Sequence, residues 1–400
     1  MGKTGSAGNH GGRIRSDCFV QIEIKNSGGV VLDLQSRVDA LYGKSIRKLV
    51  LIMMGNFGIP NAEILIRDSG ALEFVLAARI EAAVKKLGKS YIVSDLPGDP
   101  AEFPVSDRGR FRFTRLYLPG NSPGMMLNAG VHKPDGIILD LEDSVALAVK
   151  DDARILVRNA LRIVDFYGAE RMVRINQLPG GLADLDVIIP QKPDLILIPK
   201  VEDPEEIKAV DEKILEISPD STVFLMPILE SAMGIERAFE IASASPNNVA
   251  MAIGLEDYSA DMGVQRTEAG AESLYARSRM VNACKASGIQ AIDSVYSDVD
   301  NETGLRATVK KSKAMGFEGM GCIHPRQIPV IQEEFTPTSD EIERAKAIVL
   351  AFEEAEQRGQ AVVSLGSKMI DPPVVKRAQR TIDLAIQMHV VSENWRTKNE

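Results

Sequence analysis

Residues 222–230 read TVFLMPILE, an apolar run that ends on the carboxylate of Glu230. A second run, VAMAIGLED at residues 249–257, ends on two acids, Glu256 and Asp257. Continuous apolar runs of this kind are typical of strands that are buried on both faces of a parallel sheet. Because an isolated buried carboxylate is costly, strands that stop on acids indicate a site that supplies a cation or strong hydrogen bonds.

The same pattern recurs through the larger part of the chain. Eight apolar runs occur, and most are separated by amphipathic stretches whose apolar residues recur at spacings of three and four residues, as in a helix. The runs lie at residues 113–119, 136–143, 171–177, 194–201, 222–230, 249–257, 289–296 and 319–325. Eight strand-helix units in about 210 residues predict an α/β fold of the TIM (β/α)₈ barrel type.

In a TIM barrel the carboxyl ends of the strands meet at one rim, where catalysis occurs. The residues at or near the ends of the runs are Glu142, Asp143, Arg174, Asn176, Lys200, Glu230, Glu256, Asp257 and His324. Glu230 and Asp257 are predicted ligands of a divalent metal. Hard oxygen ligands without a cysteine or histidine pair favour Mg²⁺ over Zn²⁺.

Simpler interpretations of these residues remain open. The acids at the strand ends are also placed to stabilise the positive ends of the helices that follow. Arg174 is alternatively a counter-ion to the acids, and Lys200 is either a Schiff-base nucleophile or a salt-bridge partner. His324 precedes a proline and is interpreted as a structural residue.

A segment rich in Pro, Gly, Asp and Ser divides the chain and predicts a linker at 93–112. The expected domains are a small α+β domain at 1–92, the barrel at 113–350 and a C-terminal helical flap at 351–400. Within the small domain, QIEIKNSGGVVLDL at residues 21–34 predicts a hairpin, and residues 71–87 a strand that continues into a helix. A linker of this length would let the small domain carry a tethered group over a long distance.

Composition excludes several classes of partner. The net charge of −9, without a basic block, argues against nucleic acid. The three cysteines are widely spaced and show no metal or redox pairing. No apolar run of membrane-spanning length and no secretory signal are found, so we expect no membrane partner and a cytoplasmic location.

From residue 113 to about residue 380 the chain resembles the β subunit of citrate lyase and the related malyl- and citramalyl-thioester lyases of the HpcH/HpaI aldolase family. The matching segments, in the family's order, are RLYLPGNSPGM, DGIILDLEDSV, VRINQL, LIPKVED, ILESAMGI, GLEDYSADMG, GFEGMGCIHPRQI and KMIDPPVV. The resemblance implies Mg²⁺ on Glu230 and Asp257, with Glu142 and Asp143 around it and Arg174 on a substrate carboxylate. One departure is Met320, where many relatives carry lysine, and it puts thioester contacts at that position in doubt.

The small domain is similar to the acyl carrier, or γ subunit, of citrate lyase, through GKSIR, IPNAEILIRDSGALEF and AARIEAA. That subunit carries a phosphoribosyl-dephospho-coenzyme A group on a serine in a Gly-x-x-Glu-Ser-Ser/Gly-Asp motif. The corresponding segment here is GGRIRSD at residues 11–17, which lacks the glutamate. Counting forward from Gly12 puts Ser16 on the modified serine, whereas counting back from Asp17 puts Arg15 there. Ser16 is the expected attachment point.

Together these resemblances imply a carbon-carbon lyase fused to its own carrier. The expected substrate is a citryl- or citramalyl-type thioester, cleaved to an oxoacid and an acetyl-carrier. The resemblance also implies a separate transferase (α-like) subunit and a homo-oligomer, a trimer or its multiple. In it, Asp371 from a neighbouring chain would protonate the product enolate. The alternatives are a lyase of free coenzyme A thioesters with a vestigial carrier, a Schiff-base aldolase using Lys200, and a non-catalytic assembly module.

Overall fold

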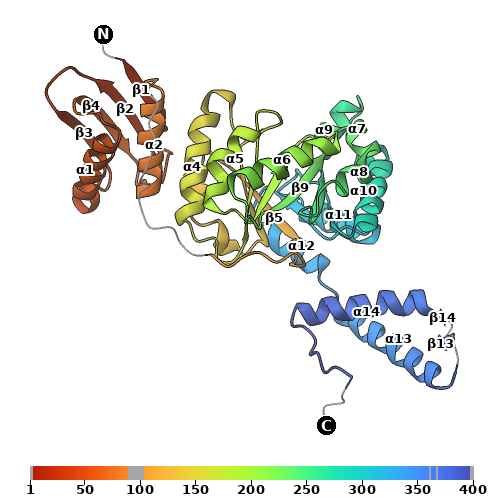
Figure 1. The fold of residues 1–400 in the computed structure, drawn as a ribbon. Coiled ribbons are helices and arrows are strands. Elements are labelled where there is room, and N and C mark those ends of the chain that lie inside the picture. The colour runs from red at the N-terminus through yellow and green to blue at the C-terminus, as the bar shows by residue number, and fades with distance from the viewer. Residues whose placement is uncertain (1–2, 89–102, 360–361, 366–367, 397–400) are drawn as a thin grey trace. The chain divides into compact units, whose positions relative to one another are not determined.

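The computed structural model describes residues 3–88, 103–359, 362–365 and 368–396 (Figure 1). The chain forms two compact units, residues 1–331 and residues 332–400. The first unit contains the small domain and the barrel. The second contains the C-terminal helices.

Eight parallel strands form the barrel, as the apolar runs predict. They are β5 (Thr114–Pro119), β6 (Gly136–Asp140), β7 (Glu170–Arg174), β8 (Leu195–Ile198), β9 (Phe224–Leu229), β10 (Ala250–Ile253), β11 (Gln290–Ile292) and β12 (Met320–Cys322). They pair in the order β11-β10-β9-β8-β7-β6-β5-β12. A parallel bridge between Asp293 and Met320 joins the two end strands, so the sheet closes on itself.

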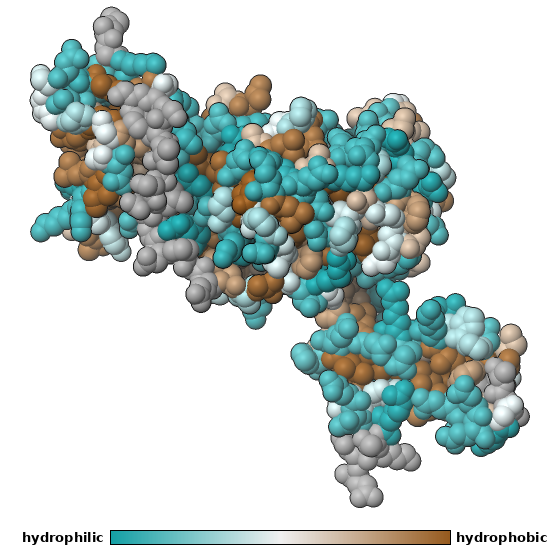
Figure 2. Space-filling view, viewed as in Figure 1, coloured by the Kyte–Doolittle hydropathy of each residue, from teal (hydrophilic) through white to brown (hydrophobic). Residues whose placement is uncertain are grey.

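Helices connect successive strands and surround the sheet (Figure 1). They are α3 (Pro123–Met126), α4 (Lys150–Ile163), α5 (Leu182–Ile188), α6 (Pro204–Ile217), α7 (Ala232–Glu236), α8 (Ala238–Ala242), α9 (Leu255–Asp261), α10 (Leu274–Ser287), α11 (Glu302–Met315) and α12 (Gln327–Phe335). α6 begins where its sequence dictates: Asp203 and Glu206 form a capping box, and Pro204 occupies the first helical position. Figure 2 shows mainly hydrophilic side chains on the outer face of the barrel helices in view.

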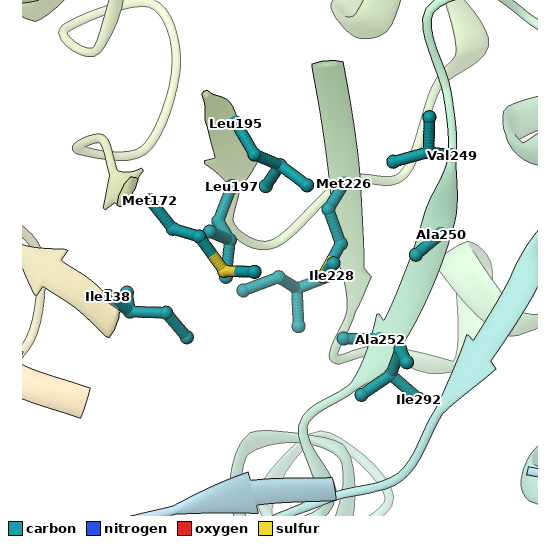
Figure 3. Packing of buried hydrophobic residues seen from close by; sticks show 10 residues of the cluster. All are labelled: Ile138, Met172, Leu195, Leu197, Met226, Ile228, Val249, Ala250, Ala252 and Ile292. Atoms are coloured by element: carbon teal, nitrogen blue, oxygen red, sulfur yellow. The ribbon is translucent and has the colours of Figure 1, made fainter. Parts of the chain in front are cut away.

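The barrel interior is filled with apolar side chains. Figure 3 shows ten of them, from Ile138 on β6 round to Ile292 on β11. A packed interior of this kind is normal for the fold, which is a core and not a pore. A cavity for a ligand is therefore expected to open at one end of the barrel and not to run through it.

Residues 103–112 cover the amino ends of the strands, although the sequence assigned them to the linker. The Phe103 ring lies over the Arg171 guanidinium, 4.3 Å from its carbon. Arg112 is fully buried and forms a bidentate pair with Glu170, at 2.8 and 2.7 Å. The remaining residues of the expected linker up to 102 lie outside the described part of the chain.

The small domain is a four-stranded sheet with two helices. Its elements are β1 (Thr4–Gly8), β2 (Cys18–Ile24), β3 (Val30–Ser36), α1 (Asp39–Asn56), β4 (Ala62–Asp68) and α2 (Glu73–Lys85). The strand order is β1-β2-β4-β3, so the predicted hairpin of β2 with β3 is wrong. β4 lies between them because Ile64 and Ile66 need burial in the centre of the sheet, whereas β3 is nowhere fully buried. The predicted strand before α2 is also absent, since the helix begins at Glu73.

Helix α2 is buried along residues 74–84. Its sequence, EFVLAARIEAAVK, is apolar on all sides, and such a helix needs packing partners on more than one face. On one side Gly5 of β1 approaches so closely that an added Cβ would lie 2.1 Å from the Ala83 carbonyl oxygen. On another side Glu81 accepts two hydrogen bonds from Arg158 of α4, at 3.0 and 2.5 Å. The small domain therefore packs on the barrel through a buried ion pair.

The second unit consists of α13 (Ser339–Gln357), a short hairpin of β13 (Val363–Leu365) with β14 (Lys368–Ile370), and α14 (Pro372–Gln387). Ala345 and Val349 of α13 pack against Ala378 and Ile382 of α14. The expected boundary at residue 350 falls inside α13. Among the described helices of the whole chain, none is long and apolar enough to cross a membrane.

The Arg112–Glu170 pair gives a test of the packing at the amino end of the barrel. Arg112→Met should lower the free energy of unfolding by about 3–5 kcal/mol, because Glu170 loses its counter-ion while it stays buried. The shift in the urea midpoint measures this loss. Arg112→Met combined with Glu170→Met should recover most of the stability, since both charges are then removed. A single variant as stable as the wild type would show that the pair is not a fixed part of the fold.

Candidate active site

A bidentate ion pair lies at the carboxyl ends of β6 and β7. Arg174 Nε is 2.6 Å from Asp140 Oδ1, and Nη2 is 2.7 Å from Oδ2. Asp140 also accepts the backbone N–H groups of Glu142 and Ser144, at 3.0 and 3.2 Å. Burial opposes ionisation of Asp140, but the Arg174 contact and these hydrogen bonds hold its pKa below the ordinary value. Asp140 therefore fixes both the guanidinium and the turn after β6.

Arg174 has donors left for a ligand. Its Nη1 lies 2.9 Å from Glu142 Oε2, and its guanidinium lies over the Tyr117 ring, 5.3 Å from the centroid. The pair with Asp140 uses two of the five guanidinium N–H groups, and the contact of Nη1 with Glu142 is an ion pair. Arg174 therefore keeps N–H groups that could donate to a ligand carboxylate.

Lys200 lies among the acids after β8. Its Nζ is 2.9 Å from Glu142 Oε1, 3.4 Å from Asp143 and 4.0 Å from Asp257 Oδ1. Burial alone would lower the pKa of Lys200, but the hydrogen bond and charge of Glu142, with the charges of Asp143 and Asp257, raise it above the ordinary value. A Schiff-base nucleophile must be a neutral amine, so this environment favours the salt-bridge interpretation of Lys200.

Glu230 follows β9 and is buried. Its Oε2 accepts the backbone N–H of Lys200 at 3.0 Å, and Lys200 has a left-handed φ of 53° at this contact. A Cβ added to Gly254 would lie 2.3 Å from Glu230 Oε1, so only glycine leaves room for the carboxylate. Burial raises the pKa of Glu230 to about 8, against the opposing charge of Arg174.

The rim carries an excess of negative charge. Among the described residues, five carboxylates, those of Asp140, Glu142, Asp143, Glu230 and Asp257, lie around the two cations Arg174 and Lys200, and Arg115 lines the same cavity. A divalent cation would offset this excess and the desolvation of Glu230. No three acid, histidine or cysteine side chains in the described residues are arranged as a complete metal cage. Two protein carboxylates, Glu230 and Asp257, with water and substrate as further ligands, fit the preference of Mg²⁺.

A cavity of about 390 Å³ opens between these groups. Charged side chains line it, among them Asp140, Asp143, Arg174, Glu230 and Asp257. Arg115 and Tyr117 of β5 and apolar side chains such as Ile228 and Val295 also line it. The cavity thus combines a cluster of charged groups with apolar walls, as in many sites for small molecules.

The structure gathers most of the expected rim residues and adds others. Arg174, Asp143, Glu142, Lys200, Glu230 and Asp257 come together, as expected from the strand ends. Asn176 instead binds Asp184 of α5 at 2.8 Å, and His324 Nδ1 accepts the N–H of Arg326 at 3.2 Å, so both have local structural roles.

Asp140, Tyr117 and Arg115 were missed by the sequence argument. The alternation of inward positions along 138, 140 and 142 is the signal that identifies Asp140. The same alternation places Arg115 and Tyr117 on one face of β5.

Ser16 lies in the small domain beside the rim. Its Cβ lies 3.8 Å from the position of a Cβ built on Gly124, which belongs to α3, the short helix after β5. The neighbouring Asp17 is buried in a bidentate pair with Arg79, and Arg79 also donates to the carbonyl of Asn121 at 3.1 Å. Ser16 itself has a left-handed φ of 55°, and its N–H bonds to the Ser69 carbonyl. This loop is therefore held at the carboxyl end of the barrel.

Asp371 belongs to the second unit, where it is the N-cap of α14. Its Oδ1 accepts the N–H of Val374 at 3.1 Å, and Pro372 follows at the first helical position. This geometry explains why an acid precedes two prolines here. It leaves the catalytic role of Asp371 as a proposal.

The arrangement of the barrel agrees with comparisons to known proteins. The model of the family described as HpcH/HpaI aldolase/citrate lyase matches residues 114–325. The chain belongs to this family. A second model, described as malonate decarboxylase delta subunit (MdcD), matches residues 6–87, so the small domain is of the acyl-carrier type.

Relatives of the HpcH/HpaI aldolase/citrate lyase family cover most of the chain. Citrate lyase subunit beta of Leuconostoc mesenteroides subsp. cremoris is 39% identical over 289 residues, which cover 70% of this chain and 96% of that protein. The mitochondrial citramalyl-CoA lyase of Mus musculus is 36% identical and covers 68% of this chain and 85% of that protein. The chain is accordingly a lyase.

Solved structures of the family share the barrel. CitE from Mycobacterium tuberculosis, in complex with magnesium, acetoacetate and coenzyme A, has a TM-score of 0.59 and 28% identity, and the match covers 70% of this chain and 99% of that one. The same protein with magnesium and pyruvate has a TM-score of 0.52 at 28% identity, with 69% and 98% covered.

Glu230→Gln should reduce lyase activity at least about a hundredfold. Mutation of a group that only hydrogen-bonds to a metal ligand already costs about 10–100-fold in metal affinity or activity, and loss of a ligand itself should cost more. The fold should survive, since the change removes a poorly solvated charge without altering shape. Steady-state turnover and the rise in Tm on adding Mg²⁺ measure both effects, and the variant should lose most of that rise. Glu256→Gln is the matched control, because the Glu256 side chain is 61% exposed and pairs with Arg266. Wild-type turnover that persists in excess EDTA would refute the metal assignment.

Proposed function

We propose that this protein is a Mg²⁺-dependent lyase that cleaves a 3-hydroxy-3-carboxy acyl thioester carried on its own N-terminal domain. The products are an oxoacid, oxaloacetate or pyruvate, and an acetyl thioester that stays on the carrier. The observation that supports this most directly is the position of Ser16, 3.8 Å from a Cβ built on Gly124 at the rim of the barrel. The expected attachment point therefore lies against α3, the short helix that follows β5.

Glu230 and Asp257 would hold Mg²⁺, which the named complexes of the Mycobacterium tuberculosis protein also contain. When bound, the ion would lower the cost of negative charge on the substrate hydroxyl and on the carbonyl that replaces it. The remaining roles belong to the side chains of this chain.

The side chains at the rim account for the bond changes. Arg174 would hold the carboxylate next to the reacting carbon through its remaining N–H groups. Asp143, whose carboxylate lines the cavity and is 53% exposed, would accept the hydroxyl proton. The C–C bond then breaks, the hydroxyl carbon becomes the ketone of the oxoacid, and the bonding electron pair moves to the α-carbon of the thioester enolate. Asp371 of a neighbouring chain would return a proton to that carbon.

The enzyme would assemble as a homo-oligomer, a trimer or its multiple, and a separate transferase subunit would load the carrier. The citrate lyase beta relatives are named as subunits, which supports a complex with other chains. A non-catalytic scaffold has no use for a rim with five carboxylates and a cavity between them.

A lyase of free coenzyme A thioesters is the second candidate. The citramalyl-CoA lyase relative and the coenzyme A in the CitE complex favour it, as does the missing glutamate in GGRIRSD. Mass spectrometry of the native chain separates the two, because only the carrier mechanism requires a phosphoribosyl-dephospho-coenzyme A adduct.

Ser16→Ala should abolish turnover of the carrier-bound substrate, since the tether supplies substrate at an effective concentration of about millimolar. The barrel should still cleave a free thioester. Peptide mass spectrometry of the wild type should place the adduct on Ser16, and Ser6→Ala in β1 is a control that leaves this loop intact. An adduct on another residue, or none on native protein, would reject this assignment.

Asp371→Asn should be nearly inactive by itself, although Asn caps a helix as well as Asp does. The thermal stability of the variant should therefore match the wild type, which separates catalysis from capping. Mixed oligomers of Asp371→Asn with Glu230→Gln should regain part of the activity, because some sites then combine an intact metal half with an intact acid. Full activity of Asp371→Asn alone, or no recovery after verified subunit exchange, would contradict a role across subunits.

A further inference from the structure

Arg115 lies inside the barrel, deeper than the ionic rim. It is two residues from Tyr117 on β5, and both line the cavity, so both side chains point into the barrel. Arg115 is 1% exposed. Its Nη1 lies 2.9 Å from the sulfur of Met226 on β9, which is four strands away around the sheet. The side chain thus extends across the interior toward the opposite wall.

The surroundings of this guanidinium are apolar. Figure 3 shows Met226 and Ile228 pointing into the interior with Ile138 and Met172. A thioether is a weak acceptor, and Arg115 Nε has no hydrogen-bond partner in the part of the chain that the structure describes. Burial lowers the pKa of Arg115, yet a guanidinium stays protonated in proteins.

The carboxylate whose charge acts on Arg115 is Glu170, and it is paired with Arg112. Two carboxylates that line the same cavity are also paired, Asp293 with Arg277 and Asp140 with Arg174. No ion pair of Arg115 occurs among the described residues. A buried cation without a counter-ion is costly, so its replacement by an apolar side chain of similar size should not destabilise the fold.

Glycines flank Arg115 on both sides, and the room that they leave is filled by other side chains. The neighbours of Arg115 in register are Gly136 on β6 and Gly321 on β12. A Cβ on Gly136 would lie 2.5 Å from Met172 Cε, and one on Gly321 would lie 2.7 Å from Val295 Cγ1. The cavity that Gly321 and Arg115 line is the one that reaches Glu230 and Asp257 at the rim.

We infer that Arg115 binds a second carboxylate of the substrate, so that the barrel acts on a citryl-type thioester and releases the dicarboxylate oxaloacetate in preference to pyruvate. This rests on the proposed function, in which Arg174 takes the carboxylate next to the reacting carbon. Pyruvate has a methyl group in place of the second carboxylate and leaves Arg115 without a partner. Sites built to bind a polar group reject analogues that lack it, because the site's own buried group is then unpaired.

Calorimetric titration of the full-length, Mg²⁺-loaded protein with oxaloacetate and with pyruvate tests the inference. The wild type should bind oxaloacetate more tightly than pyruvate. Arg115→Met should weaken oxaloacetate binding about 10- to 100-fold, the range of a charge-assisted hydrogen bond. Pyruvate affinity should stay within about threefold. The Tm of the ligand-free variant should be equal to or above that of the wild type, since an unpaired buried charge is removed.

Two further variants separate ligand binding from a structural role. Arg115→Lys keeps the charge and should retain part of the preference for oxaloacetate, and it also serves if Arg115→Met does not fold. Arg112→Met is the matched control, because Arg112 is equally buried but paired with Glu170. It should lower Tm and leave the preference unchanged.

The outcomes distinguish this inference from the proposed function. A preference that survives Arg115→Met, or a loss of Tm with equal weakening of both ligands, would overturn the role of Arg115 alone. Tighter binding of pyruvate than of oxaloacetate by the wild type would also overturn the role of Arg115. The protein would then be a lyase of the citramalyl type, which releases pyruvate. Binding of neither oxoacid with Mg²⁺ present would overturn the lyase proposal as well.

Discussion

The bidentate contact between Arg174 and Asp140 is the interaction on which the arrangement of the rim depends. Asp140 fixes the turn after β6 through two backbone hydrogen bonds, and Arg174 reaches from β7 to hold Glu142. Glu142 in turn holds Lys200 after β8, and the backbone of Lys200 binds Glu230 after β9. One ion pair therefore begins a chain of contacts that connects four successive strands. The acids can stay together before any substrate arrives because this chain offsets part of their repulsion.

Buried ion pairs also join segments that are far apart in the sequence. Arg112 ties the segment before the barrel to β7, and Arg79 ties the Ser16 loop to α2 and to the turn after β5. Each of these arginines has a carboxylate partner, which is the usual condition for burying a charge. Arg115 departs from that condition, and this difference sets it apart as a group that acts on a ligand.

The sequence predicts the barrel well because eight apolar runs and their spacing admit few other folds. It also predicts that Arg174, Lys200, Glu230 and Asp257 come together, since strand ends in a parallel barrel meet at one rim. The pairing of β2 with β4 was not predictable from hairpin patterning, because burial of the central strand decides it. β1 was missed because TGSAG does not alternate apolar and polar residues. Its Gly5 is required because α2 packs too closely against the strand for a Cβ at that position. The buried position of Arg115 was not predictable because the side chain that it contacts, Met226, comes from a strand distant in sequence.

The coverage of the amino ends of the strands by residues 103–112 has a consequence for the order of events. With those ends covered and the interior packed, the cavity opens at the carboxyl rim. On the proposed function, a thioester on the carrier would enter with its oxoacid portion first and would occupy the opening behind it. After cleavage the shortened acyl arm would have to withdraw before the oxoacid could diffuse out. Product release would then be sequential, and a high concentration of the oxoacid would compete with the next loaded arm for the same entrance.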